Sequence, residues 1–163
     1  MSACVDGNME HAQQELANVL TRILESNGRP FVLGGGHEVG WATYLGAQQF
    51  LHTHAPDKTI GIINFDAHFD LRNPEPMASS GTPFRQCQEW CHHNSVPFHY
   101  SVIGVNPSAN TDALFQFAFD HNVNWVEDLD CNIAALPELK QQIRDWIQPL
   151  DFVYVTLCLD VFP

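Results

Sequence analysis

The sequence predicts an α/β fold in which a mainly parallel sheet lies between two layers of helices. Short apolar runs, typical of strands buried on both faces, alternate with segments whose apolar residues recur at helical spacing. Such alternation is typical of parallel strands joined by helical crossovers. In addition, 163 residues with 45% hydrophobic side chains are enough to bury the core of one domain. We therefore expect residues 1–163 to form a single domain.

Composition excludes several classes of function. A formal net charge of −12, with seven lysines and arginines, argues against a nucleic-acid partner, because phosphate binding needs clustered basic side chains. No apolar run approaches the roughly 18 residues that cross a bilayer, so we expect no membrane association. Residues 1–6 lack a basic start followed by an apolar stretch, so we expect no signal peptide. Five cysteines without framework spacing fit a reducing cytoplasm.

The first third of the chain predicts two helices around a short strand. Apolar residues over 9–26 fall on one helical face, with Asp6 or Asn8 as the N-cap and a glycine and a proline after the end. The apolar run at 31–33 predicts a strand covered on both faces. A second helix is expected over 39–52.

The same alternation continues to the end of the chain. A buried strand begins at Ile60, within an isoleucine-rich run. The later segments predict, in order, a helix over 84–93, a strand over 98–105, a helix over 111–121, a strand over 123–126, a helix over 133–147 and a strand over 152–159.

Three metal-ligand residue types follow the strand that begins at Ile60, at alternate positions: Asp66, His68 and Asp70. In an extended chain, side chains two positions apart point the same way, so these three can converge on one point. Two carboxylates and an imidazole suit a hard or borderline divalent ion such as Mn²⁺. The alternative is an ordinary polar loop in which these side chains are hydrogen-bonded or solvated.

Neighbouring segments add further candidates. Three glycines at 34–36 lead into His37 at the end of a predicted strand, where open α/β sheets bind ligands; the alternative is a capping or loop histidine. The polar loop 71–83 starts beside the candidate ligands and is expected to form a wall of a substrate site. Cys87 and Cys91, one helical turn apart, either hold zinc or lie on a partly buried helix face.

Four motifs come in the order found in the ureohydrolases, the group that includes arginase, agmatinase and formimidoylglutamase. They are Gly-Gly-Gly-His-Glu at 34–38, Asn-Phe-Asp-Ala-His-Phe-Asp-Leu-Arg at 64–72, Ser-Ser-Gly-Thr-Pro-Phe at 79–84 and Cys-Leu-Asp at 158–160. The chain resembles this family along nearly its whole length, and its motifs look most like those of formimidoylglutamase, an enzyme of histidine degradation. The resemblance implies an arginase-like three-layer fold. Because members of the family are about twice as long, it also implies a chain truncated at both ends.

The resemblance implies a site with two Mn²⁺ ions. His37 and Asp70 would bind one ion and His68 the other, with Asp66 as a bridge between them. Asp66, His68 and Asp70 are also the three residues whose alternate spacing suits such an ion.

The last strand of the family carries the pattern D-x-D, in which the first aspartate bridges the two metals and the second completes one of them. Asp160 matches the second position, whereas Cys158 stands at the first. A thiolate can still coordinate, but it is softer than a carboxylate. The alternative for Cys158 is a buried apolar thiol.

The resemblance further implies metal-assisted hydrolysis of the C–N bond of N-formimidoyl-L-glutamate to L-glutamate and formamide. Arg72 would pair with a substrate carboxylate, unless it is a surface arginine paired with Glu75. Ser80 stands where arginase and agmatinase place a proton-shuttling histidine. Because a serine is no base near neutral pH, we expect Ser80 to bind the substrate and assign no residue to proton transfer. An agmatinase or guanidinobutyrase activity and an inactive metal-binding fragment are the alternatives. Family members are often trimers or hexamers, which allows a homo-oligomer.

Overall fold

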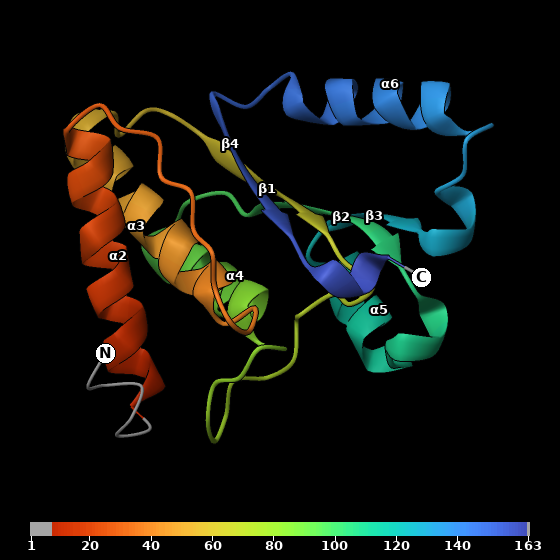
Figure 1. Ribbon diagram of the computed structural model, residues 1–163, viewed down its shortest axis with the longest axis horizontal. Coiled ribbons are helices and arrows are strands. Elements are labelled where there is room, and N and C mark those ends of the chain that lie inside the picture. Colours follow the sequence, from red (N-terminus) through yellow and green to blue (C-terminus); the bar gives the residue numbers. More distant parts are fainter. Residues whose placement is uncertain (1–7, 163) are drawn as a thin grey trace.

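A four-stranded sheet with helices on both faces forms the frame of the protein in a computed structural model that describes residues 8–162 (Figure 1). The strands are β1 (Ile60–Phe65), β2 (His99–Val105), β3 (Asn124–Glu127) and β4 (Phe152–Leu157). All neighbours are parallel, and their order is β3-β2-β1-β4. The predicted α/β fold with a parallel sheet is therefore confirmed.

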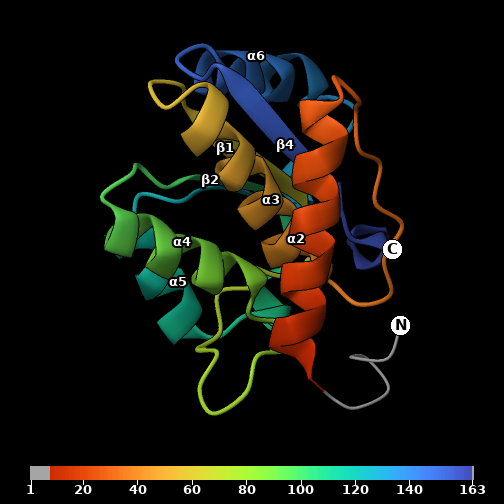
Figure 2. The same ribbon diagram turned by 90° about the vertical axis from the view of Figure 1, so that its left-hand side faces the viewer.

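The helices divide unequally between the two faces. Four of them lie on one side of the sheet and α6 (Leu136–Ile147) lies on the other (Figures 1 and 2). The four are α2 (Met9–Glu25), α3 (Val39–His54), α4 (Pro83–Asn94) and α5 (Asp112–Asp120). Within residues 8–162, no helix combines the length and the hydropathy that a membrane crossing requires.

The N-terminal cap of α2 is Asn8, as the sequence predicts. Its side-chain oxygen accepts a hydrogen bond from the backbone N–H of His11 at 3.0 Å, which satisfies one of the unpaired donors of the first turn. The alternative cap, Asp6, lies outside the described residues, as does the segment 1–6 for which we expect no signal peptide.

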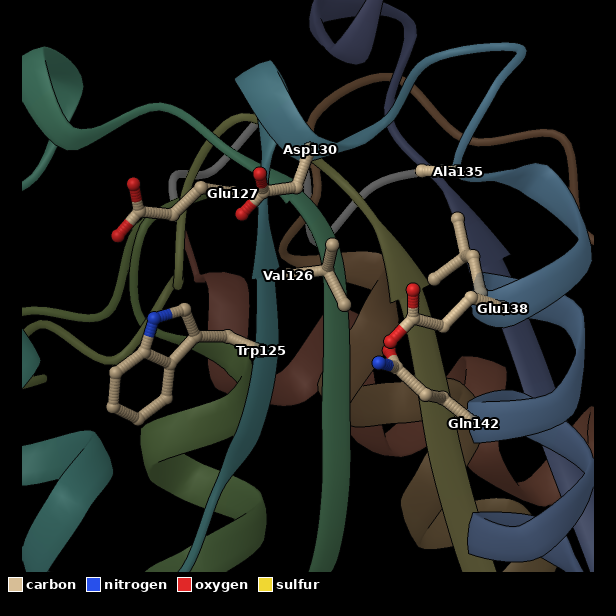
Figure 3. Close-up of a pocket in the computed structure, with 8 residues that line it drawn as sticks. Trp125, Val126, Glu127, Asp130, Ala135, Glu138 and Gln142 are labelled. Carbon is tan, nitrogen blue, oxygen red and sulfur yellow. The ribbon is translucent and has the colours of Figure 1, made fainter.

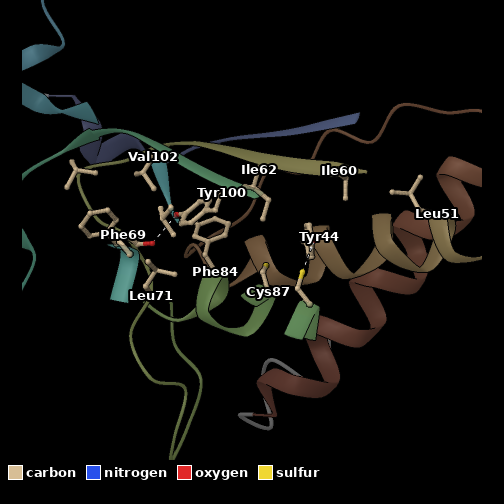
Figure 4. Packing of buried hydrophobic residues seen from close by; sticks show 14 residues of the cluster. Tyr44, Leu51, Ile60, Ile62, Phe69, Leu71, Phe84, Cys87, Tyr100 and Val102 are labelled. Carbon is tan, nitrogen blue, oxygen red and sulfur yellow. Dashed lines mark hydrogen bonds between the residues drawn. The ribbon is translucent and has the colours of Figure 1, made fainter. Parts of the chain in front are cut away.

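The main core lies between the sheet and helices α3, α4 and α5 (Figure 4). Phe84, at the start of α4, stacks on Tyr100 of β2 with ring centroids 4.6 Å apart. Cys87 and Cys91 belong to the same core, and the Cys91 sulfur lies 3.1 Å from the hydroxyl oxygen of Tyr44. The part of the chain that the structure describes brings no third metal ligand to these thiols, so they form a buried helix face and not a zinc site.

Two predicted elements differ from the structure. The predicted strand at 31–33 is wrong: its backbone is irregular, and Phe31 and Leu33 are each 87% exposed. An apolar run becomes a strand only when a neighbour takes up its backbone hydrogen bonds, and none of the described strands pairs with it. The helix expected over 133–147 begins only at Leu136, because the preceding residues form a turn.

β4 forms an edge of the sheet and exposes apolar side chains. Among the described residues no strand pairs with its outer side, and Val155 and Leu157 are 58% and 54% exposed. The strand expected over 152–159 ends at Leu157, because Cys158 then leads into a 3₁₀ turn at Leu159–Val161. An apolar edge of this kind is a template for pairing with another protein segment.

Gly46→Ala tests how closely α2 and α3 pack. A Cβ at Gly46 would lie 2.7 Å from the carbonyl oxygen of Ala17 and 2.8 Å from Cβ of Leu20. Alanine gains about 1 kcal/mol in helix propensity, whereas overpacking costs about 1–3 kcal/mol. Because the clash involves backbone atoms that cannot turn aside, we expect the free energy of unfolding in urea to fall by about 1–2 kcal/mol.

The matched control is Gly35→Ala. No atom lies within 4 Å of a Cβ placed there, so its stability should change by less than about 0.5 kcal/mol. Equal stabilities of the two variants would contradict the close approach of the helices.

Candidate metal centre

The candidate ligands meet at the carboxyl ends of β1 and β4, which are neighbours in the sheet. β1 ends at Phe65 and is followed at once by Asp66. β4 ends at Leu157 and is followed by Cys158, whose N–H donates to the carbonyl oxygen of Phe65 at 2.9 Å. Parallel pairing therefore brings the two predicted ligand segments together, at the edge where open α/β sheets bind ligands.

The segment Asp66 to Asp70 converges through a turn and not through an extended strand. Oδ1 of Asp66 accepts a hydrogen bond from the backbone N–H of His68 at 2.8 Å, and Asp70 has a left-handed backbone with φ of 50°. The predicted alternation along one strand face is therefore wrong, because the strand ends before the motif begins. A carboxylate that bonds the backbone two residues on stabilises a turn of this kind.

His37 lies at the centre of a first cluster. Its Nδ1 is 2.8 Å from Oδ2 of Asp66 and 2.9 Å from Oδ2 of Asp70. This nitrogen is buried, yet it makes no hydrogen bond of acceptable geometry within residues 8–162. Cys158 completes the cluster, since its sulfur, a ring nitrogen of His37 and an oxygen of Asp66 all lie within 4.8 Å of one another.

Asp66 also belongs to a second cluster, with His68 and Asp160. Nδ1 of His68 lies 3.5 Å from Oδ1 of Asp66 and 3.1 Å from Oδ2 of Asp160. Asp66 therefore faces His37 with one carboxylate oxygen and His68 with the other. Two clusters that share one carboxylate are the arrangement expected of a two-metal site.

Charge is concentrated in this part of the protein. Burial by itself lowers the pKa of His37, but the adjacent Asp66 and Asp70 carboxylates outweigh it and raise that pKa to about 9. Burial also raises the pKa of Asp70, and it raises the pKa of the Cys158 thiol to about 12. Buried carboxylates are costly unless a cation lies beside them, which makes this cluster a cation-binding environment.

The donor atoms and their spacing fit a divalent ion. An octahedral ion with ligand distances of about 2.1 Å holds adjacent ligand atoms about 3 Å apart. The 2.8 and 2.9 Å separations around Nδ1 of His37 match that spacing. A neutral His37 with its proton on Nε2 presents a lone pair at Nδ1, which is the atom that has no hydrogen-bond partner among the described residues.

Three residues that the sequence analysis does not single out hold these ligands in place. Oγ1 of Thr156 lies 3.0 Å from Nε2 of His37 and can accept the proton of that nitrogen. Asn64 donates from Nδ2 to Oδ2 of Asp66 at 3.1 Å and to the hydroxyl oxygen of Tyr100 at 3.0 Å. Outer hydrogen bonds of this kind orient metal ligands.

A signal for two of these residues is present in the sequence. Asn64 precedes Asp66 by two positions and therefore shares its side of the chain. Thr156 pairs with Asn64 in the register of β1 and β4, and it lies two positions before Cys158. Polar residues two positions before a ligand, on apolar strands, are thus the pattern to search for.

The predicted substrate residues Arg72 and Ser80 lie on opposite sides of one loop that closes on itself. The backbone N–H of Arg72 donates to the carbonyl oxygen of Gly81 at 3.0 Å, so the residue after Ser80 lies against Arg72. Both predicted residues are exposed. Arg72 forms no ion pair with Glu75 in the part of the chain that the structure describes, so that alternative is not supported.

Two cavities beside the sheet are distinct from the cluster around His37. One, of about 410 Å³, lies between β3 and α6, with Trp125 and Glu127 on one side of β3 and Glu138 and Gln142 on the other (Figure 3). The second, of about 670 Å³, is largely apolar and reaches the candidate ligands only at Asp160. The candidate centre is therefore a convergence of polar side chains at strand ends and not a large cavity.

Comparison with known proteins places these observations in a family. The chain matches the sequence model of the arginase family over residues 2–163. The chain belongs to the arginase family. The match includes all the candidate ligands, so the clusters around Asp66 lie within the region that defines the family.

Curated relatives of this arginase-family chain include formimidoylglutamases from several bacteria. That of Vibrio cholerae is 45% identical over 166 residues, which cover 98% of this chain and 49% of the relative. That of Aliivibrio fischeri is 42% identical over 178 residues, covering 98% of this chain and 51% of the relative. The chain thus spans about half the length of the curated relatives that it matches.

Solved structures show the same fold. Formimidoylglutamase from Bacillus subtilis superposes with a TM-score of 0.74 at 23% identity, over 91% of this chain and 45% of that one. Trypanosoma cruzi formiminoglutamase with Mn²⁺ superposes with a TM-score of 0.65 at 24% identity, over 85% of this chain and 44% of that one. Arginase from Entamoeba histolytica in complex with L-ornithine superposes with a TM-score of 0.74 at 18% identity, over 94% of this chain and 54% of that one. The arginase-like three-layer α/β/α fold is therefore confirmed.

Thr156→Val tests whether the outer hydrogen bonds position the ligands. The substitution keeps the branched shape but removes the partner of Nε2 of His37. Because loss of an outer partner costs about 10–100-fold in metal affinity, we expect Mn²⁺ to bind at least about tenfold more weakly. Titration with Mn²⁺, followed by the electron paramagnetic resonance of the free ion, measures this change.

The control is Thr53→Val, since the Thr53 hydroxyl is exposed and bonds only the carbonyl oxygen of Gln49 one turn earlier in α3. This variant should bind Mn²⁺ like the original protein. If Thr156→Val also binds it unchanged, Thr156 does not position His37.

Proposed function

We propose that this protein is a manganese-dependent hydrolase that cleaves the C–N bond of N-formimidoyl-L-glutamate, giving L-glutamate and formamide. The observation that carries the proposal is the Asp66 carboxylate, which faces His37 with one oxygen and His68 with the other. The curated relatives, at 41–45% identity, are formimidoylglutamases, and the T. cruzi formiminoglutamase structure contains Mn²⁺.

Six side chains form the proposed ligand set for two Mn²⁺ ions. Asp66 would be the bridge, and the others are His37, His68, Asp70, Cys158 and Asp160. Bound metal would activate a water molecule at the working pH. It would also stabilise the charge that develops on the atoms bonded to the amidine carbon of the substrate. The protein's own part is to hold these ligands in fixed positions through outer hydrogen bonds from three neighbouring strands.

Arg72 is the proposed partner of a substrate carboxylate. It follows Asp70 by two residues, so its loop starts at the proposed ligands. A guanidinium beside the site favours the anionic formimidoylglutamate over cationic substrates such as agmatine. Ser80, across the loop, is proposed to donate a hydrogen bond to the substrate, since its hydroxyl is no base near neutral pH.

We further propose that the protein works in the cytoplasm, on a small-molecule substrate, as a homo-oligomer. Free thiols at all four cysteines within residues 8–162 support a reducing compartment. The exposed apolar side chains of β4, which a protein surface would cover, support association.

Arg72→Ala tests the substrate assignment in the Mn²⁺-loaded protein. Loss of a charged hydrogen bond costs about 1.5–3 kcal/mol, or about 10–100-fold. We expect kcat/KM for N-formimidoyl-L-glutamate to fall by that factor, mainly through a higher KM, in an assay of formamide release.

The matched control is Arg22→Ala, because Arg22 is exposed on α2, and it should leave kcat and KM unchanged. Faster hydrolysis of agmatine than of N-formimidoyl-L-glutamate, or no formamide release at all, would contradict the proposed function. An unchanged KM in Arg72→Ala would contradict only the role of Arg72.

A further inference from the structure

Cys158 differs from the other described cysteines in what surrounds it. Cys87 and Cys91 lie among apolar side chains in the core, and Cys131 is exposed. Of these four, only Cys158 belongs to a group of metal-binding side chains, where it joins an imidazole and a carboxylate.

The backbone fixes the thiol at this place. The N–H of Cys158 donates to the carbonyl oxygen of Phe65, the residue directly before Asp66, at 2.9 Å. Its own carbonyl oxygen accepts the N–H of Val161 at 3.4 Å and so closes the turn that carries Asp160. The sulfur therefore belongs to the first cluster, with His37 and the shared Asp66, and it stands at the start of the turn that carries Asp160.

The alternative role of Cys158, a buried apolar thiol, does not agree with these surroundings. A thiol that acts as a small hydrophobic group packs against carbon, as Cys87 does with no exposed surface. Cys158 is partly exposed, and its sulfur lies within 4.8 Å of a ring nitrogen of His37 and of a carboxylate oxygen of Asp66. A polar, ligand-rich environment of this kind is where a cysteine can bind metal.

We propose that the Cys158 thiolate is a metal ligand that raises the affinity of this manganese centre for softer ions such as Co²⁺ and Zn²⁺, relative to a carboxylate at the same position. The inference rests on the metal centre of the proposed function. On binding, the S–H bond breaks, a metal–sulfur bond forms and the proton passes to solvent, with no change of oxidation state. Carboxylate and water suit Mn²⁺, whereas thiolate suits Zn²⁺ and its neighbours, so this one residue sets the metal specificity.

Cobalt provides the direct test. The metal-free protein is titrated with Co²⁺ in the absence of oxygen and its absorption spectrum is recorded. A thiolate ligand gives a near-ultraviolet sulfur-to-cobalt charge-transfer band, which oxygen and imidazole ligands do not give. We expect this band in the original protein and in the control Cys131→Ser, and we expect Cys158→Ser to bind Co²⁺ without it.

A competition between Co²⁺ and Mn²⁺ measures the specificity itself. Cys158→Asp replaces the sulfur by the carboxylate of the D-x-D pattern. We expect its preference for Co²⁺ over Mn²⁺ to fall at least about tenfold relative to the original protein, the lower end of what metal-site substitutions cost. This variant also covers the case in which Cys158→Ser does not fold.

The outcomes separate the two proposals. Co²⁺ binding without the band in the original protein, a band that survives in Cys158→Ser, or an unchanged preference in Cys158→Asp overturns the role of Cys158 and leaves the metal centre standing. If the folded protein binds neither ion, both the metal centre and this inference are overturned.

Discussion

Burial of the Asp66 carboxylate is the constraint on which the rest of the site depends. Asp66 is 1% exposed, and an uncompensated charge at such a place costs several kcal/mol. The protein meets this cost with donors to both oxygens: the His68 backbone N–H on one, and Asn64 on the other. His37 adds positive charge when it is protonated, and a divalent cation would replace that proton and satisfy several carboxylates at once.

The sheet and the core keep these groups in position. Parallel register between β1 and β4 places Asn64 beside Thr156, and each of them contacts a proposed ligand. Phe84 stacks on Tyr100 and packs its ring edge-on against His37, with centroids 5.2 Å apart. The hydroxyl of Tyr100 donates to the carbonyl oxygen of Phe69 and accepts from Asn64, so a chain of packed and hydrogen-bonded groups leads from the core to Asp66.

Local signals in the sequence identified the candidate ligands but not how they converge. The alternation of Asp66, His68 and Asp70 predicts a shared strand face, whereas the strand ends first and a turn brings them together. The prediction of a strand at 31–33 is wrong because a strand needs a pairing partner, which an apolar run does not reveal. Asn64 and Thr156 each precede a candidate ligand by two positions, but such residues are common on ordinary strands, and it is the register that shows which ligands they contact; Tyr100 carries no comparable signal. The sequence predicts the parallel sheet correctly from the alternation of apolar runs and helical faces. This pattern reflects which side chains are buried, so it does not depend on where each strand or helix begins and ends.

The most direct test of the metal centre is an anomalous difference map from crystals grown with Mn²⁺, recorded at the manganese absorption edge. We expect one peak bonded to Oδ2 of Asp66 and Nδ1 of His37, and a second on the Oδ1 side of Asp66 between His68 and Asp160. A well-ordered Asp66 with no anomalous peak beside it, in crystals where Mn²⁺ was present in excess, would contradict the metal centre and with it the proposed function.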